Sequence, residues 1–147
     1  MDITNRDRVL ATDGSKIASE TIPFARMVRG VSGSPGEVEL VQSAAPHRAT
    51  GPALYLQQIA SQNEAEEYQE KDPVLIGLEG PLPAEYSNST GNPVDVEPDM
   101  FLVLADDGFV DLEVTPYTKT INSLYKVVVG KLAVADATTA YLEVVKA

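Results

Sequence analysis

Hydrophobic and polar positions alternate through the last third of the chain, with turn sequences between the runs. Residues 100–105 (MFLVLA) are apolar, 106–108 (DDG) have turn chemistry, and apolar and acidic residues alternate over 110–114 (VDLEV). Two further apolar runs follow, at 125–136 and 141–146. Alternation with a period of two indicates strands with one solvated face, and a short turn between two such runs indicates a hairpin. The sequence therefore predicts two C-terminal hairpins.

The first two thirds of the chain contain further strand patterns. Residues 21–31 (TIPFARMVRGV) and 37–42 (EVELVQ) flank a Gly-Ser-Pro turn at 32–36, which predicts a hairpin. Residues 73–80 (PVLIGLEG) read as a buried strand. The segment 81–93, which holds three prolines, is predicted as a long loop.

Two segments have weaker patterns. Residues 1–20 are polar and mixed in charge, which predicts an arm or a loosely attached first strand, with a disordered terminus as the alternative. Residues 52–71 are rich in Ala, Gln and Glu, and Pro52 suits a first helical turn. A short helix is favoured there over a short strand followed by an acidic loop. Apolar positions at helical spacing support it, namely Leu56, Ile59 and Ala60.

These elements predict a mainly β fold, a compact β-barrel or sandwich. The chain has 147 residues, of which 44% are hydrophobic, and this fits one domain with a real core. We expect an N-terminal arm over 1–20 and a single β-rich domain over 21–147 that includes the short helix.

The charge balance restricts the partners. The chain has 11 Lys and Arg against 22 Asp and Glu, a net charge of −11. Phosphate backbones and anionic membrane surfaces should repel it, so neither nucleic acid nor a membrane is an expected partner. No Cys is present, which excludes disulfides and thiolate chemistry. The first residues lack the apolar stretch of a signal peptide, and synthesis in the cytosol is expected.

The ionisable residues do not form a recognisable catalytic or metal-binding set. His47 is the only histidine, and it stands in a loop sequence. The acidic run from Asp95 suggests a calcium loop, but Met100 stands where that loop needs Gly and Asp106 where it needs Glu. The prediction is a protein that is not an enzyme, with no catalytic residue, no metal site and no cofactor.

The arginines concentrate in the first third of the chain. They are Arg6, Arg8, Arg26, Arg29 and Arg48. This asymmetry favours a face that docks on an acidic or polar partner, with a scattered solvated set as the alternative.

The order of the C-terminal elements resembles a known family. A strand at 73–80, a hydrophobic hairpin, the phrase YKVVVGKLA at 125–133, an acidic turn and a closing YLEVV are similar to the small β-barrel decoration proteins of tailed phages, also called head cement proteins. The resemblance covers the last half of the chain. It implies a structural virion protein without chemistry of its own, which binds the capsid exterior as a homotrimer and stabilises contacts between subunits of the major capsid protein.

The resemblance also implies that an N-terminal arm makes the capsid contact. The residues then predicted to bind the partner are Ile3, Arg6, Arg8, Val9, Leu10, Arg26 and Arg29. The alternative is a soluble β-sandwich module of a tail or adhesin component, which would bind a glycan or protein through the 81–93 loop. A small hydrolase or isomerase on a barrel is a third interpretation, for which no catalytic residue can be named.

Overall fold

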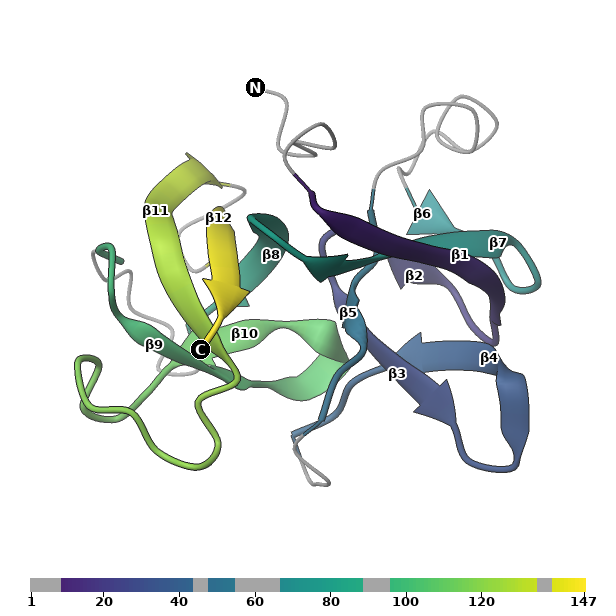
Figure 1. Ribbon diagram of the computed structural model, residues 1–147, viewed down its shortest axis with the longest axis horizontal. Helices are drawn as coiled ribbons and strands as arrows, with labels where there is room; N and C mark the ends of the chain where they lie inside the picture. The colour runs from purple at the N-terminus through teal and green to yellow at the C-terminus, as the bar shows by residue number, and fades with distance from the viewer. Residues whose placement is uncertain (1–8, 44–47, 55–66, 89–95, 135–138) are drawn as a thin grey trace.

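The computed structural model describes residues 9–43, 48–54, 67–88, 96–134 and 139–147. In this part of the chain two bodies of β-structure lie side by side, as Figure 1 shows. The C-terminal strands close into a barrel, and the N-terminal strands form a five-stranded sheet with a two-stranded sheet beside it. The prediction of a mainly β, compact barrel fold is confirmed.

The barrel contains five strands in the order β10-β8-β12-β11-β9. Their bounds are β8 Leu82–Ser87, β9 Phe101–Leu104, β10 Val110–Leu112, β11 Tyr125–Val134 and β12 Thr139–Lys146. Both predicted C-terminal hairpins are present, because β9 pairs antiparallel with β10 and β11 with β12. Closure pairs the strands on both sides, so the barrel presents no long free edge.

Apolar side chains at alternate strand positions fill the barrel. Leu102 and Leu104 of β9 are buried there with Leu142 and Val144 of β12. Tyr125, at the start of β11, is one of the largest fully buried side chains. Since strand side chains alternate between two faces, these positions define the inner face of the barrel.

The N-terminal strands form a sheet in the order β5-β3-β4-β1-β7. Their bounds are β1 Ala11–Ala18, β3 Met27–Val31, β4 Ser34–Leu40, β5 Gly51–Pro52 and β7 Pro73–Glu79, and β2 Ile22–Pro23 pairs separately with β6 Glu67–Tyr68. The predicted N-terminal hairpin is present as the antiparallel pair of β3 and β4.

The two edges of this sheet are linked to each other. Ala53, just after β5, forms an antiparallel bridge with Ile76 of β7. The Leu54 amide donates to the Leu75 carbonyl oxygen at 2.8 Å. The sheet thereby surrounds a second hydrophobic cluster that includes Val28 and Val38.

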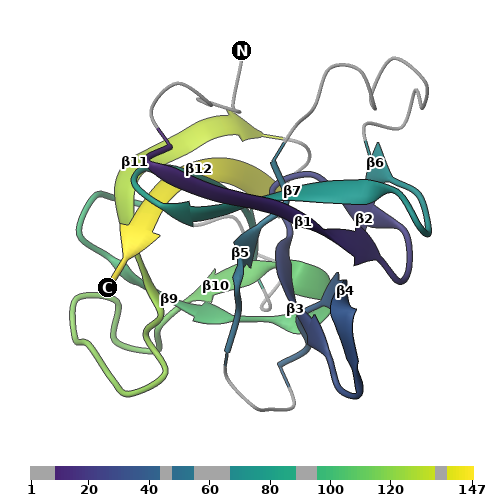
Figure 2. The ribbon, with the colours of Figure 1, turned by 45° about the vertical axis from the view of Figure 1, so that its right-hand side comes forward.

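The predicted N-terminal arm is a strand over the part that the structure describes. Residues 11–18 form β1, which pairs with β4 on one side and β7 on the other (Figure 2). Of the two forms predicted for residues 1–20, an arm or a loosely attached first strand, the described part is a strand. It is paired on both sides and not loosely attached. Its sequence, ATDGSKIA, has few apolar residues, but the strand pairs with β7 along most of its length and with β4 at Ile17 and Ala18. Residues 1–8 lie outside the described residues.

Two other predictions are corrected. The 81–93 segment is not a loop over its first half, because β8 pairs with β12 at six positions from Leu82 to Ser87. Its three prolines obscured an alternating pattern. The short helix predicted within 52–71 does not begin at Pro52, which lies in β5, and Glu67 and Tyr68 form β6. Pro52 pairs with Met27 of β3 on the edge strand, where a missing N–H is tolerated. The centre of that segment, 55–66, lies outside the described residues.

The sheet and the barrel meet where β3 begins and β4 ends. Met27 and Val41 belong to the barrel core, whereas their neighbours Val28 and Leu40 belong to the sheet core. The turn between β9 and β10 closes this joint, since the Gly108 amide donates to the Val41 carbonyl oxygen at 2.8 Å. One pair of strands therefore supplies side chains to both cores.

We expect Gly108→Ala to lower the free energy of unfolding by about 1–3 kcal/mol. Gly108 has a φ of +78°, and a Cβ there would lie 2.8 Å from the Met27 carbonyl oxygen. The control is Gly36→Ala in β4, where a Cβ would meet nothing within 4 Å. Urea denaturation of both variants measures the effect, and equal midpoints for the two would contradict the tight approach at the joint.

Candidate functional site

Arg26, predicted to bind a partner, is engaged within the molecule. Its Nε lies 2.6 Å from Glu85 Oε1 of β8, and the two side chains are only 17% and 8% exposed. Its Nη1 donates to the Asp107 carbonyl oxygen at 3.0 Å. The guanidinium carbon lies 3.6 Å from the centre of the Phe109 ring, in cation–π geometry. Arg26 therefore fastens the start of β3 to the barrel.

The 106–108 turn adds polar contacts to the same joint. Asp106 accepts hydrogen bonds from both the hydroxyl and the amide of Ser43, at 2.6 and 2.9 Å. The Gln42 side chain accepts from the Asp107 amide at 3.1 Å. The Ser43 side-chain hydrogen bond and then its amide hold the pKa of Asp106 below the ordinary 3.8.

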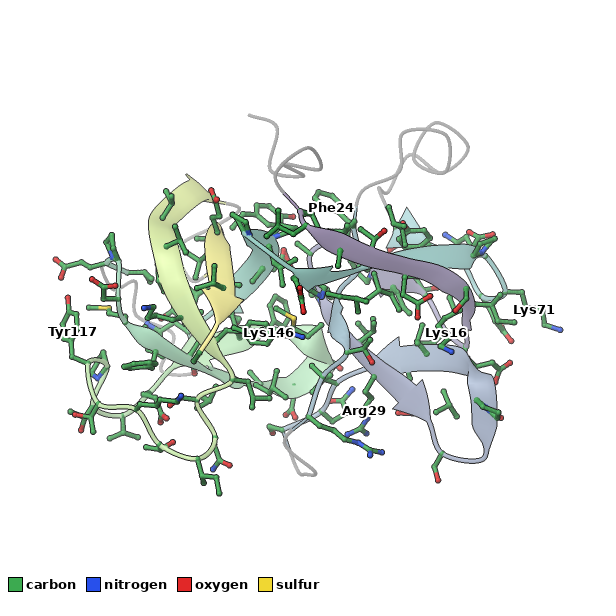
Figure 3. The ribbon with its side chains drawn as sticks, in the orientation of Figure 1. Lys16, Phe24, Arg29, Lys71, Tyr117 and Lys146 are labelled. Carbon is green, nitrogen blue, oxygen red and sulfur yellow. The ribbon has the colours of Figure 1, made fainter. Side chains whose placement is uncertain are left out.

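Arg29 lies on β3 and is bound less completely than Arg26. Its Nη2 donates to Glu39 Oε2 of β4 at 3.4 Å, a long ion pair. Its Nη1 is buried and has no hydrogen-bond partner in the described part of the chain. Figure 3 shows Arg29 below the joint, on the side of the sheet that faces the barrel strands.

The remaining predicted partner residues fall in different settings. Val9 packs against the barrel core, and the next residue, Leu10, is 78% exposed. Ile3, Arg6 and Arg8 lie outside the described residues. The structure thus places the described candidates at separate points and assigns Arg26 a structural contact.

Sequence reasoning missed three exposed large apolar side chains, which belong to the segment between β10 and β11. In this 113–124 loop, Val114 is 99% exposed, Ile121 95% and Tyr117 56%. The signal in the sequence was the isolated Val and Ile among Thr, Ser, Pro and Lys, a composition that does not form a strand.

Hydrogen bonds hold the 113–124 loop in one conformation. The Glu113 carboxylate accepts from the hydroxyls of Thr120 and Ser123. The Phe101 amide donates to the Pro116 carbonyl oxygen at 2.8 Å, which anchors the loop to β9. The Tyr117 hydroxyl donates to Glu97 Oε2 at 2.5 Å, and this bond raises the pKa of Tyr117. The exposed apolar side chains are therefore presented by an ordered loop.

The ionisable groups of the described residues do not converge on a centre for chemistry. No group of three His, Cys, Asp or Glu residues among them could hold a metal ion. Burial raises the pKa of Tyr125 to about 12, and burial with the nearby Asp111 charge raises that of Tyr86 to about 12. Both tyrosines lie in the barrel core. Within the described chain, no helix has the length and apolar character needed to span a membrane.

We expect Arg26→Ala to destabilise the protein by about 2–4 kcal/mol, because it leaves Glu85 as an unpaired, nearly buried charge. The control is Lys126→Ala, which removes an exposed ion pair of 3.8 Å to Asp99 and should cost about 1 kcal/mol or less. Thermal and urea unfolding measure both. If the two variants lose the same stability, Arg26 does not hold the joint.

We expect Ser43→Ala to raise the pKa of Asp106 toward 3.8. The hydrogen bond from the Ser43 hydroxyl to the Asp106 carboxylate is the largest cause of the lowered pKa, and the substitution removes it. A depressed carboxyl pKa stabilises the folded state above the ordinary value, and this contribution is lost as the pH falls through the folded pKa. NMR titration of the Asp106 carboxyl carbon measures the shift. An unchanged midpoint in Ser43→Ala would mean that the hydroxyl does not set the pKa.

The fold is shared with a solved phage protein. The structure described as that of the "head fiber gp8.5 N base in bacteriophage phi29" matches this chain with a TM-score of 0.51 and 11% sequence identity, over 93% of each chain. No family model matches the sequence, and no curated protein matches it. At this identity the likeness establishes a common fold that extends over the sheet and the barrel together.

Proposed function

We propose that this protein is a non-enzymatic structural component of a tailed-phage head, which binds the exterior of the capsid and stabilises contacts between shell subunits. The observation that carries the proposal is the shared fold with the phi29 head fiber base over 93% of both chains. A match over nearly the whole chain includes both the barrel and the sheet, so it concerns the arrangement of two parts and not one common barrel.

The physical character of the molecule supports this role. The two β bodies are fastened to each other by Arg26 and by the 106–108 turn, so they can transmit load as one unit. The ordered 113–124 loop offers exposed apolar side chains to a partner. A protein that binds only the assembled shell stabilises it by mass action, and many copies on a symmetric lattice multiply weak contacts.

We further propose the major capsid protein as the partner and a homotrimer as the bound form. No catalytic group or cofactor has a part in this function, and the protein would reside on the outer face of the virion. The contact cannot be tested by deleting residues 1–20. That deletion would remove β1, which pairs with both β4 and β7, and would disturb the fold itself.

The test is densitometry of this protein against the major shell protein in purified particles from the source that encodes it. We expect a copy number of the same order as the shell protein, and we expect particles stripped of the protein to lose their DNA at a lower temperature. Complete absence from purified particles would overturn the proposal and favour a soluble binding module. A few copies per particle would instead indicate a tail or adhesin component.

A further inference from the structure

Two neighbouring surface cavities bring together basic side chains from distant parts of the chain. One cavity, of about 280 Å³, has Arg29, Arg48 and Thr50 in its wall. The other, of about 500 Å³, has Lys119 and Lys146 in its wall. The cavities adjoin, because Ala49 lines both of them. We name the four basic side chains around them, Arg29, Arg48, Lys119 and Lys146, the basic surface.

The charge of the basic surface is opposite to that of the whole molecule. The chain has 11 basic and 22 acidic residues, yet among the described residues that line these two cavities four are basic and none is Asp or Glu. Within the described part of the chain, Arg48, Lys119 and Lys146 form no ion pair. Unpaired cations in concave surfaces focus positive potential and attract anionic ligands.

Arg29, which lines one cavity, has a hydrogen-bond donor that is not used within the described residues. Its Nη1 is buried and has no acceptor among the described residues, and its Nη2 reaches Glu39 only at 3.4 Å. A buried donor without an acceptor is unfavourable, and the guanidinium fork matches a carboxylate in two-point geometry. After a rotation of the Arg29 side chain, a carboxylate in the cavity would supply the missing acceptor.

The second cavity combines its lysines with apolar groups. Ile121 and Leu124 line it beside Lys119 and Lys146, and Ile121 is 95% exposed. The 113–124 loop lies beside the end of β12 in Figures 1 and 2, where the Ala147 amide donates to the Leu124 carbonyl oxygen at 3.0 Å. A ligand that satisfies this surface needs both carboxylates and an apolar side chain.

We propose that the basic surface holds an acidic peptide segment of the shell protein, with carboxylates at Arg29, Arg48, Lys119 and Lys146 and an apolar side chain against Ile121. The identity of the partner rests on the proposed function, whereas the peptide chemistry rests on the cavities. A nucleic acid fits less well, because the net charge of −11 repels a phosphate backbone over the rest of the surface.

The test uses the full chain and a charge-reversed triple variant, Arg48→Glu, Lys119→Glu and Lys146→Glu. All three side chains are exposed, so the variant should fold. The control triple, Lys16→Glu, Lys71→Glu and Lys126→Glu, reverses the same number of charges outside both cavities. Figure 3 shows Lys16 in β1 and Lys71 in the turn before β7, both away from Lys146. Circular dichroism verifies that both variants fold.

The first readout is co-sedimentation with particles stripped of the protein. We expect the triple variant to bind at least about tenfold more weakly than the wild type, because like charges then face the acidic segment. The control triple should bind within about threefold of the wild type, because it changes the net charge of the molecule but not the cavities. Equal binding by both triples would overturn the basic surface while leaving the proposed function intact.

The second readout does not need particles. The probe is a peptide of sequence Glu-Glu-Leu-Glu-Glu. Its binding is measured by the NMR chemical shifts of the backbone amides in the isotope-labelled full chain. We expect shifts at Ala49, Ile121 and Leu124 in the wild type and the control triple, and none in the triple variant. Failure of the wild type to bind particles, with these shifts present, would refute the proposed function and retain the peptide site.

Two results would overturn the peptide assignment. One is binding of a single-stranded oligothymidylate of equal charge as tightly as the peptide, which would assign the surface to nucleic acid. The other is self-association of the wild type that the triple variant loses in sedimentation equilibrium, which would assign the surface to a second copy of the chain.

Discussion

The arrangement of the two β bodies depends on the contact that Arg26 makes between them. Its guanidinium meets a carboxylate from β8, a carbonyl oxygen from the turn after β9 and the face of Phe109. Neither hydrophobic cluster is large, and small cores have little stability of their own. A buried charge is tolerated only where its partners are complete, so the ion pair fixes where β3 must lie against the barrel. The placement of β3 against the barrel therefore depends on this contact.

The turn at 106–108 illustrates how a local feature acquires a second role. Asp107 and Gly108 both have positive φ, at 59° and 78°. A hairpin turn of this composition is predictable from the sequence because the required conformations depend on the turn residues themselves. Its contact with Val41, through the Gly108 amide, is not predictable in this way, because the partner lies in another sheet. The turn therefore both reverses the chain and connects the barrel to the end of β4.

The same distinction explains which elements were predicted. Both C-terminal hairpins and the strand at 73–79 followed from alternation and turn residues, which are local signals. β8 was missed because Pro83 within it and Pro81 just before it indicated a loop, although the pairing with β12 decides its structure. Arg26 was assigned to a partner because its internal acceptors are 59 and 81 residues away. The exposure of Val114 and Ile121 could not be predicted from the sequence, because it depends on which residues the closed barrel excludes from its core.

The basic surface takes residues from both β bodies, and this links binding to stability. Arg29 belongs to β3 of the sheet, whereas Lys146 belongs to β12 of the barrel, and Ala49 lines both cavities between them. A ligand that contacts both bodies binds only the joined form. Binding and the joining of the two bodies are therefore coupled, and each stabilises the other by the same free energy. The fixed spacing set by Arg26 in turn spares the ligand the cost of ordering the two bodies. A weakened joint should therefore lower affinity for an acidic segment even when all four basic side chains are retained.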